Sequence, residues 1–504
     1  MKCWKLLCFF IIIYVGLIIY VFPTRSIESD EGTHLLLGLF YHDLFNFALN
    51  NGFSNVYEFA IDYLVHYPKL SVYYPPLYHI LIALFYNFTV SENIGRVISL
   101  VFSVGSIVLV YKLGSFLYNQ RVGLISAIFL GSLPIIVYIS KSIYIDMFLF
   151  FFFLLSFYLG LIAFKRKKWV YYILLGVTLA FAFFTKWPAI LSMPILFFYL
   201  LIQRRIKVSQ KIYIVKKLVF SFFIFLLIIL PYLYLSYKFG LLKMGLSATV
   251  IREAIIFPQW TTIEGWLYYP KLLPIQMSYP IAVISLFSLG WFVWKREKYY
   301  DLLIVWGLIV YLFFSFLMGK NVRYTTLYLP VLLLPLAFYI EKIIRKNKYF
   351  VIIVIFSVIF LLITSYYSLT KLVQPINETA KFIHENANGN IAFISEMNSF
   401  HTSSFMFYFE KIDRNRSKII YRPCVFFNKS EGEINNFVVE NNIEYFVFIE
   451  GNDKIETLNE IRDIDLKKQF GPAKVYVLKN FQIKPYQKCN YICLTEEKIC
   501  SSFS

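Results

Sequence analysis

Charged side chains are scarce in this chain of 504 residues: Asp, Glu, Lys and Arg together make up 16%, against 59% hydrophobic residues. A soluble chain usually carries roughly 25% charged residues. So apolar a chain could not shield its hydrophobic surface from water, which excludes a soluble globular protein, a disordered chain and a small disulfide scaffold. Apolar runs of about 17 to 23 residues recur along most of it, each long enough to cross a bilayer core as a helix. We therefore predict a polytopic α-helical membrane protein.

Acidic residues are fewer than basic ones, 30 against 49, and the imbalance is confined to one part of the chain. Residues 1–370 hold 32 basic and 13 acidic residues, whereas residues 371–504 hold 17 of each. A nucleic-acid-binding protein would carry its basic excess on a soluble face. An excess of Lys and Arg between apolar runs instead indicates cytoplasmic loops. We therefore expect residues 1–370 to associate with the lipid bilayer and not with a nucleic acid.

The basic clusters predict the topology, because they fall at alternate ends of the apolar runs. They are Arg121, Lys165–Lys168, Arg204–Lys217, Lys295–Lys298 and Lys342–Lys348. Placing them all in the cytoplasm predicts about eleven transmembrane helices, with the N-terminus inside and the C-terminus outside. The predicted spans lie near 4–22, 96–118, 122–142, 147–164, 169–185, 188–203, 217–236, 276–294, 302–319, 324–341 and 349–369.

Two apolar runs need a separate interpretation. Leu6–Phe22 is longer than a signal-peptide core of about 7–15 residues and no Ala-x-Ala site follows it, so we interpret it as a retained helix. Pro75–Val90 is short for a span and would spoil the alternation of charge, so we expect it at the outer interface. The polar stretch at about 24–72 is then the first outer loop of a membrane domain that covers residues 1–370.

The pattern changes near residue 371, where helical and strand-like segments begin to alternate. The helical patterns are Glu378–Asn388, Glu431–Asn441 and Lys454–Arg462, and the strand-like runs are Ile391–Ser395, Lys418–Arg422, Tyr445–Glu450 and Lys474–Leu478. We predict a small extracytoplasmic α/β domain with a partly parallel sheet over residues 371–504. Asn-x-Ser/Thr triplets at Asn377, Asn415 and Asn428 are compatible with an external position.

Cysteine is rare, with six residues in the chain, and four of them fall in this external part. They are Cys424, Cys489, Cys493 and Cys500, which allow three disulfide pairings. A metal site is the alternative, although their spacing matches no zinc pattern closely.

The sequence also lacks a Gly-rich phosphate loop, an HExxH motif and a visible internal repeat. A charged side chain in or against a bilayer is costly in free energy, so such residues are candidates for a functional role. We therefore consider the few acidic residues near the outer face. Asp30 and Glu31 follow the first apolar run, and Asp30 and His34 are spaced one helical turn apart. Asp146 stands at the outer junction of two apolar runs. The alternative for Asp30 and for Asp146 is a helix N-cap.

Six segments resemble, in order, the polytopic glycosyltransferases that use polyprenyl-phosphate sugars, which include the dolichyl-phosphate-mannose protein mannosyltransferases and the aminoarabinose transferases of lipid A. The segments are Asp30-Glu31, Tyr74-Pro75-Pro76-Leu77-Tyr78, Ile94–Ser99, Lys141–Asp146, Phe183–Pro188 and Asn321–Tyr324. They cover about residues 25–340. A Trp-Trp-Asp-Tyr-Gly motif is missing, which argues against the oligosaccharyltransferase branch.

The resemblance implies roles for individual residues. Asp30 would take the acceptor proton, with Glu31 beside it, and Asp146 would orient the acceptor or share a divalent metal with Asp30 and His34. Mg, Mn or Zn is the candidate cofactor, and His79 is a further candidate ligand; packed histidines are the alternative.

The resemblance also implies contacts to the donor. The basic residues Lys186, Arg323, Arg96 and Lys69 would hold the donor phosphate, and Tyr74, Pro75, Pro76 and Tyr78 would form a substrate loop. Tyr74 stands where the family has Lys, so Lys69 is a substitute. The alternative for each basic residue is an interfacial side chain that snorkels to the membrane surface.

The function implied is the transfer of a sugar from a polyprenyl- or dolichyl-phosphate carrier to the hydroxyl of a protein, glycan or lipid acceptor, with inversion. A transporter or flippase of lipid-linked sugars is the alternative from another class, and it would favour internal repeats and acids near the membrane midplane. An inactive relative whose external domain only binds is a third hypothesis.

Overall fold

The computed structural model describes most of the chain. The described residues are 2–22, 27, 29–68, 70, 74–203, 206–238, 258–317, 319–346, 349–367, 376–394, 400–422, 430–449, 461, 463–471, 473–484, 488–492 and 497–500. The chain divides into two compact units. The first comprises Met1–Pro23, Tyr73–Tyr78 and Arg96–Thr370, and the second Thr24–Val72, His79–Gly95 and Lys371–Ser504.

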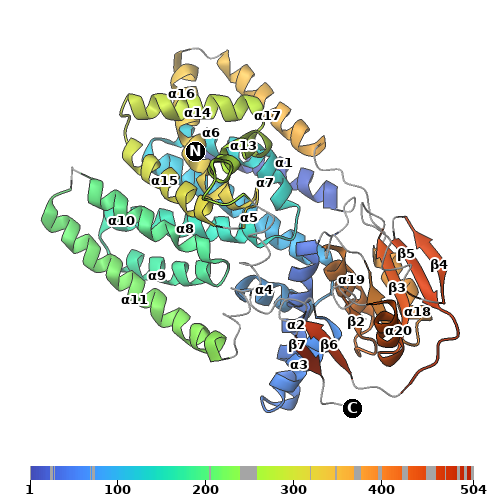
Figure 1. Cartoon of the computed structure of the whole chain (residues 1–504). Helices are drawn as coiled ribbons and strands as arrows, with labels where there is room; N and C mark the ends of the chain where they lie inside the picture. Colours follow the sequence, from blue (N-terminus) through green and yellow to red (C-terminus); the bar gives the residue numbers. More distant parts are fainter. Residues whose placement is uncertain are drawn as a thin grey trace. The chain divides into compact units, whose positions relative to one another are not determined.

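The first unit is built from apolar helices (Figure 1). They are α1 (Lys2–Val21), α5 (Glu92–Leu117), α6 (Gln120–Ser132), α7 (Pro134–Ser140), α8 (Ile145–Arg166), α9 (Trp169–Phe183), α10 (Ser192–Ile202), α11 (Val208–Lys238), α13 (Ile263–Met277), α14 (Tyr279–Trp294), α15 (Tyr300–Phe316), α16 (Leu329–Lys346) and α17 (Phe350–Tyr367). Two 3-10 helices, η2 (Trp187–Leu191) and η3 (Tyr324–Tyr328), precede α10 and α16. The start of α5 and most of α4 (Leu77–Tyr86) belong to the second unit.

Several of these helices are suited to cross a membrane. Among the described residues, five are long and apolar enough, namely α1, α5, α8, α11 and the stretch Tyr324–Lys346. The shorter helices α9, α14 and α15, and η2 with α10, are apolar as well. The chain is therefore a multi-pass membrane protein, and a helix occurs at each predicted span. The count of eleven stays a prediction, because several of these helices are short for a full crossing.

The predicted span 122–142 is not one straight helix, which corrects the sequence interpretation. It consists of α6 and α7, which are bent by 66° at a short break. The break falls at Leu133, which has extended backbone angles, and Pro134 begins α7. Proline has no backbone N–H to donate and restricts the residue before it, so the first helix ends there.

The second unit contains α2 (Ser29–Asn51), α3 (Val56–His66), α18 (Ile376–Asn386), α19 (Phe400–Ile412), α20 (Glu431–Glu440) and a five-stranded sheet. The sheet order is β2-β1-β3-β5-β4, from β1 (Asn390–Phe393), β2 (Ile420–Tyr421), β3 (Ile443–Ile449), β4 (Ile464–Phe470) and β5 (Ala473–Leu478). Strand β1 pairs in parallel with β2 and β3, whereas β5 is antiparallel to β3 and β4. The sheet is thus partly parallel, and each predicted strand occurs in it.

The predicted and observed elements of the C-terminal region differ in several places. The predicted helix Lys454–Arg462 lies almost entirely outside the described residues. Helix α19 was not predicted, and neither were β4 and the hairpin β6 (Cys489–Ile492) with β7 (Glu497–Cys500). Residues 402–410 of α19 are all buried, so this stretch has no solvent-exposed face that would impose a 3.6-residue polar period on the sequence.

The predicted first outer loop belongs to the same compact unit as the C-terminal region, which corrects its assignment to the membrane domain. The boundary after Thr370 agrees with the change in composition, but residues 24–72 belong to the second unit. Val65 of α3 is fully buried in one hydrophobic core with Ala392 of β1 and Phe446 of β3. The sequence division overlooked this because it grouped segments by their order along the chain.

The cysteine pairing stays a prediction. In the hairpin, Cys489 stands directly opposite Cys500 in the Cα register. Cys424 and Cys493 lie outside the described residues.

Candidate active site

Asp146 is the centre of a buried group of charges in the first unit. It lies in the first turn of α8 and its side chain is 2% exposed. Its Oδ1 accepts a hydrogen bond from Lys186 Nζ at 3.2 Å, and its Oδ2 lies 3.3 Å from a terminal nitrogen of Arg323. Tyr144 stands at the N-cap position of α8, so Asp146 is not the cap. One carboxylate therefore contacts two cations, and the charges of these three side chains sum to about +1.

The local sequence places Lys186 in this group. Helix α9 ends at Phe183, and Pro188 lies at the start of η2, where its fixed φ favours a new helical start. Lys186 between them has an extended backbone, and its Nζ lies 4.2 Å from the ring centroid of Tyr324. The aromatic face stabilises the ammonium group without neutralising it.

Arg323 is held by polar contacts that leave its charge in place. Asn321 Oδ1 accepts hydrogen bonds from its backbone N–H at 3.0 Å and from its Nε at 3.2 Å. Its guanidinium carbon lies 3.8 Å from the ring centroid of Tyr144. Lys186 and Arg323 keep 22% and 11% of their side chains exposed.

A buried amide fixes the segment that carries Arg323. Gln276 of α13 is fully buried, and its Nε2 donates to the carbonyl oxygen of Val322 at 2.6 Å and to Thr325 Oγ1 at 2.8 Å. Its Oε1 accepts from the Tyr328 hydroxyl at 2.9 Å. The amide thus bridges residues on both sides of Arg323 and restricts where that side chain can start.

The predicted substrate loop is attached close to Lys186. The backbone N–H of Leu77 donates to the carbonyl oxygen of Phe184 at 3.1 Å, two residues before Lys186. Tyr78 is fully buried, and its hydroxyl lies 3.3 Å from Ser99 Oγ. Pro75 is buried, whereas Tyr74 and Pro76 are partly exposed.

Arg96 and Lys69 are the other two predicted phosphate ligands. Arg96 is 4% exposed and donates to the carbonyl oxygen of Phe22 at 2.7 Å, next to the end of α1. Lys69 lies outside the described residues. Their phosphate-binding roles stay predictions.

The first-loop acids lie in the second unit, at the start of α2. The helix begins at Ser29, so Asp30 and Glu31 are in its first turn, where carboxylates favour the positive end of the helix dipole. Asp30 is partly exposed and Glu31 is buried. One turn later, His34 Nδ1 lies 3.0 Å from His79 Nε2, and both rings are buried.

The described residues do not fit a metal centre. Among them, no group of three or more His, Cys, Asp or Glu side chains is arranged to hold an ion. Both oxygens of Asp146 already face cations, and His34 shares a hydrogen bond with His79. Dependence on a divalent metal stays a prediction.

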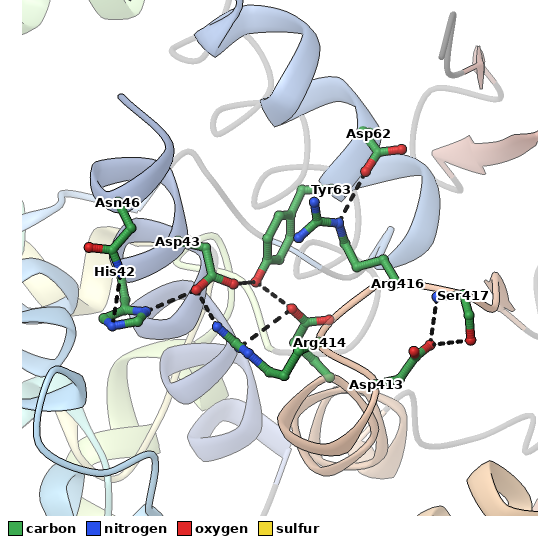
Figure 2. A network of polar contacts seen from close by, with 10 residues as sticks. His42, Asp43, Asn46, Asp62, Tyr63, Asp413, Arg414, Arg416 and Ser417 are labelled. Atoms are coloured by element: carbon green, nitrogen blue, oxygen red, sulfur yellow. Dashed lines mark hydrogen bonds and ion pairs between the residues drawn. The ribbon is translucent and has the colours of Figure 1, made fainter. Parts of the chain in front are cut away.

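A second polar group, which sequence reasoning missed, lies between α2, α3 and the end of α19 (Figure 2). Tyr63 of α3 contacts both Asp43 of α2 and Glu410 of α19, and Arg414 ion-pairs with Asp43. These residues come from segments about 350 positions apart, and no motif in the chain marks them.

Comparisons with known proteins agree with the resemblance predicted from the sequence motifs. Residues 74–234 match the family described as dolichyl-phosphate-mannose-protein mannosyltransferase. This stretch includes the Pro75-Pro76 loop, Asp146 and Lys186. A search of the curated protein sequences finds no match.

Two solved structures show that the fold is shared. ArnT from Cupriavidus metallidurans bound to undecaprenyl phosphate has a TM-score of 0.63 and 13% identity, over 95% of this chain and 99% of that chain. The oligosaccharyltransferase AglB from Archaeoglobus fulgidus, in complex with an inhibitory peptide and a dolichol-phosphate, has a TM-score of 0.52 and 11% identity, over 86% of this chain and 69% of that chain. The chain has an ArnT-like fold.

Proposed function

We propose that the chain is an integral membrane glycosyltransferase that takes a sugar from a polyprenyl-phosphate carrier at the outer face of the membrane. The acceptor is a hydroxyl group of a protein, glycan or lipid, and the sugar is a hexose or a pentose. The observation that carries this proposal is the Asp146 group, in which one carboxylate contacts both Lys186 and Arg323 and so places two cations side by side. The match to the mannosyltransferase family and the ArnT-like fold support it.

The two cations suit the leaving group of the reaction. As the bond between the anomeric carbon and the phosphate oxygen breaks, negative charge builds up on the polyprenyl phosphate. Cations that are already in place stabilise that charge without having to reorganise. Arg323 can contact two phosphate oxygens through its planar fork, and Lys186 adds a compact charge. Asp146 positions both cations.

An apolar cavity that is lined in part by Trp187 suits the lipid part of the donor. It has a volume of about 330 Å³ and is lined by Leu179, Trp187, Ile190, Leu191, Met193, Pro194, Phe222, Phe225 and Phe313. A second apolar cavity of about 310 Å³ shares Met193, Pro194 and Phe222 with it. Trp187 directly follows Lys186, so a phosphate held by Lys186 would have an apolar path for its prenyl tail along α10 and α11.

The proton of the acceptor hydroxyl needs a base. Asp30 is the proposed base, because it is partly exposed at the start of α2 and matches the first-loop acid of the family. The acceptor oxygen then attacks the anomeric carbon, the carbon–oxygen bond to the phosphate breaks, and the sugar is transferred with inversion. Polyprenyl phosphate leaves as the anion and Asp30 holds the proton.

A donor panel tests the proposal. Purified protein in lipid is incubated with polyprenyl-phosphate hexoses and pentoses and with acceptor hydroxyl compounds, and the released polyprenyl phosphate is measured. Release that requires an acceptor and is lost in Asp30→Asn supports a transferase. Movement of the intact lipid-linked sugar across vesicles without release would support a flippase and refute the proposal.

A further inference from the structure

Helix α19 packs along α2, the helix that carries Asp30. A Cβ added to Gly32 of α2 would lie 2.4 Å from the backbone nitrogen of Ser404, so the two backbones approach as closely as glycine allows. The next residue, Thr33, donates from Oγ1 to Ser403 Oγ at 3.0 Å. These contacts lie two and three residues after Asp30. The position of the proposed base therefore depends on how α19 is held.

At the other end of this interface, one hydroxyl group lies between two carboxyl groups (Figure 2). The Tyr63 hydroxyl lies 2.8 Å from Asp43 Oδ2 and 2.8 Å from Glu410 Oε1. Tyr63 and Glu410 are fully buried, and the side chain of Asp43 is 11% exposed. Arg414 contacts Asp43 and lies 3.7 Å from Glu410 Oε1.

A count of hydrogens shows that this arrangement needs an additional proton. A tyrosine hydroxyl has one hydrogen, so it can donate to only one of the two carboxyl groups. The second contact is a hydrogen bond only if that carboxyl group is itself protonated and donates to the tyrosine oxygen. Two ionised carboxylates on either side of one hydroxyl would also repel each other.

Glu410 is the carboxyl group that holds the proton. Asp43 faces Arg414 and accepts from His42 Nδ1 at 2.9 Å, so it is stabilised as a carboxylate. Among the described residues, Glu410 Oε2 makes no hydrogen bond of good geometry, although the Tyr67 hydroxyl is close to Glu410, and burying such a charged oxygen is costly. The chain of donors thus runs from Glu410 to Tyr63 and from Tyr63 to Asp43.

The surroundings support this assignment. Burial raises the pKa of Glu410 to about 8, although the nearby hydroxyls of Tyr67 and Tyr63 and the charge of Arg416 act in the opposite direction. Burial also acts to raise the pKa of Asp43, but the His42 hydrogen bond and the Arg414 charge outweigh it and lower that pKa.

Two further charged groups near the end of α19 have partners of their own, although the charge of Arg416 also acts on Glu410. Arg416 donates from Nε to Asp62 of α3 at 3.0 Å, and Asp413 accepts from the backbone N–H of Ser417 at 2.8 Å. On α18, the ring of His384 packs against the ring of Phe409.

We propose that Glu410 is a positioning residue: as a neutral carboxylic acid it links α19 through Tyr63 to Asp43 and holds α2, with Asp30, in its working place. The effect on catalysis rests on the proposed function. The protonated link itself does not, because it concerns the packing of the second unit. The C-terminal region thus acts as part of the catalytic apparatus through α19.

The link is tested first without any substrate. The thermal stability of the purified full chain is measured between pH 5 and pH 9 for the wild type, Glu410→Gln and Glu385→Gln, the last a control on an exposed residue of α18. Glutamine resembles the neutral acid and can donate to Tyr63, but it cannot lose a proton. A carboxyl band in infrared spectra of the wild type at neutral pH, absent in Glu410→Gln, gives an independent readout.

The direction of the pH effect follows from the raised pKa. A group with a pKa of 4.5 when unfolded and about 8 when folded contributes its stability fully below pH 4.5 and loses it as the pH rises to about 8. Within that window the folding equilibrium of the wild type should fall up to tenfold per pH unit relative to Glu410→Gln and then level off. The control should follow the wild type. A Glu410→Gln variant that is less stable than the wild type by the same amount at every pH would show that Glu410 is ionised and would overturn the proposal.

Activity then tests the positioning role. At pH 8.5, where the wild type has lost the proton, Glu410→Gln should keep a higher kcat than the wild type, and Tyr63→Phe should have a low kcat at every pH. The donor KM should be little changed in both variants. Equal kcat–pH profiles for the wild type and Glu410→Gln, despite the difference in stability, would refute the catalytic part alone. A lack of transfer in all proteins would refute the proposed function and leave the stability result standing.

Discussion

The guanidinium carbon of Arg323 lies 3.8 Å from the ring centroid of Tyr144, the residue at the N-cap position of α8. The ring face lies within cation–π distance of the guanidinium group while one of the guanidinium nitrogens faces Asp146. A lysine ammonium group has no plane to stack and cannot reproduce a two-pronged contact. The pair therefore predicts that the kind of cation matters at this position, and not only its charge.

Arg323→Lys should keep the charge and still impair use of the donor. We expect the donor KM to rise about tenfold, since loss of one charge-assisted contact is typically worth about 1.5–3 kcal/mol. Arg323→Ala and Lys186→Ala should show at least the same loss. The check is a steady-state measurement with a polyprenyl-phosphate donor, and Lys298→Ala at a predicted cytoplasmic loop is the control. Unchanged donor KM and kcat in all three site variants would show that these side chains only snorkel to the membrane surface.

Asp146→Asn should destabilise the protein because it leaves two partly buried cations without their counter-charge. Removing one partner of a buried ion pair typically costs about 3–5 kcal/mol, and the partial exposure of Lys186 should reduce this. The double variant Asp146→Asn with Lys186→Met should recover part of the loss, because it restores the charge balance. Thermal unfolding in detergent measures both variants. Additive losses in the double variant would contradict the ion-pair arrangement.

Gln276→Leu should affect the donor site without touching it. The substitution removes both donors to the segment around Arg323 and leaves the Val322 carbonyl and the Tyr328 hydroxyl without this partner. We expect a higher donor KM, because Arg323 then samples more positions, with a smaller effect on kcat. The exposed Gln120 at the start of α6 provides the control, as Gln120→Leu. A normal donor KM in Gln276→Leu would show that Arg323 binds the donor without help from the Gln276 hydrogen bonds.

The sequence identified the charged members of the candidate site better than it identified their arrangement. Asp146, Lys186 and Arg323 were each singled out by a family motif, but no motif states that one carboxylate holds both cations. Gln276 gave no signal, because a neutral amide in an apolar helix has no pattern of its own. Its importance comes only from the backbone carbonyl and hydroxyl groups that reach it in the fold.

In the second unit, too, the sequence predicted local elements but not the contacts between distant segments. Its strands were predicted from short β-branched and aromatic runs, which is local information. Helix α19 was missed because it is buried on all sides, and with it Glu410 and its contacts to Asp43 and Tyr63. Such contacts depend on which distant segments meet, and neither periodicity nor composition contains that information.

The side of the membrane on which the C-terminal region lies is a separate prediction. The alternation of Lys and Arg clusters places residues 371–504 outside the cytoplasm. A single cysteine at the exposed position Glu378, in a chain whose other cysteines are replaced, should react with a membrane-impermeant reagent in intact cells. A cysteine at Arg121, in a predicted cytoplasmic loop, should react only after lysis. The reverse pattern would invert the topology.

Asp30→Asn tests the proposed base most sharply. The substitution keeps the shape of the side chain and removes its ability to accept a proton. A positioned base contributes roughly 10²–10⁴-fold, so the rate of transfer should fall by at least the lower figure. Donor binding and thermal stability should be close to those of the wild type, because Asp30 is partly exposed in the first turn of α2. If Asp30 only stabilised the start of α2, the substitution would remove a favourable interaction with the helix dipole, typically worth about 0.3–1 kcal/mol of stability, and transfer would stay near normal. Near-normal transfer by Asp30→Asn would therefore end its assignment as the base and move the hypothesis to Glu31 or Asp146.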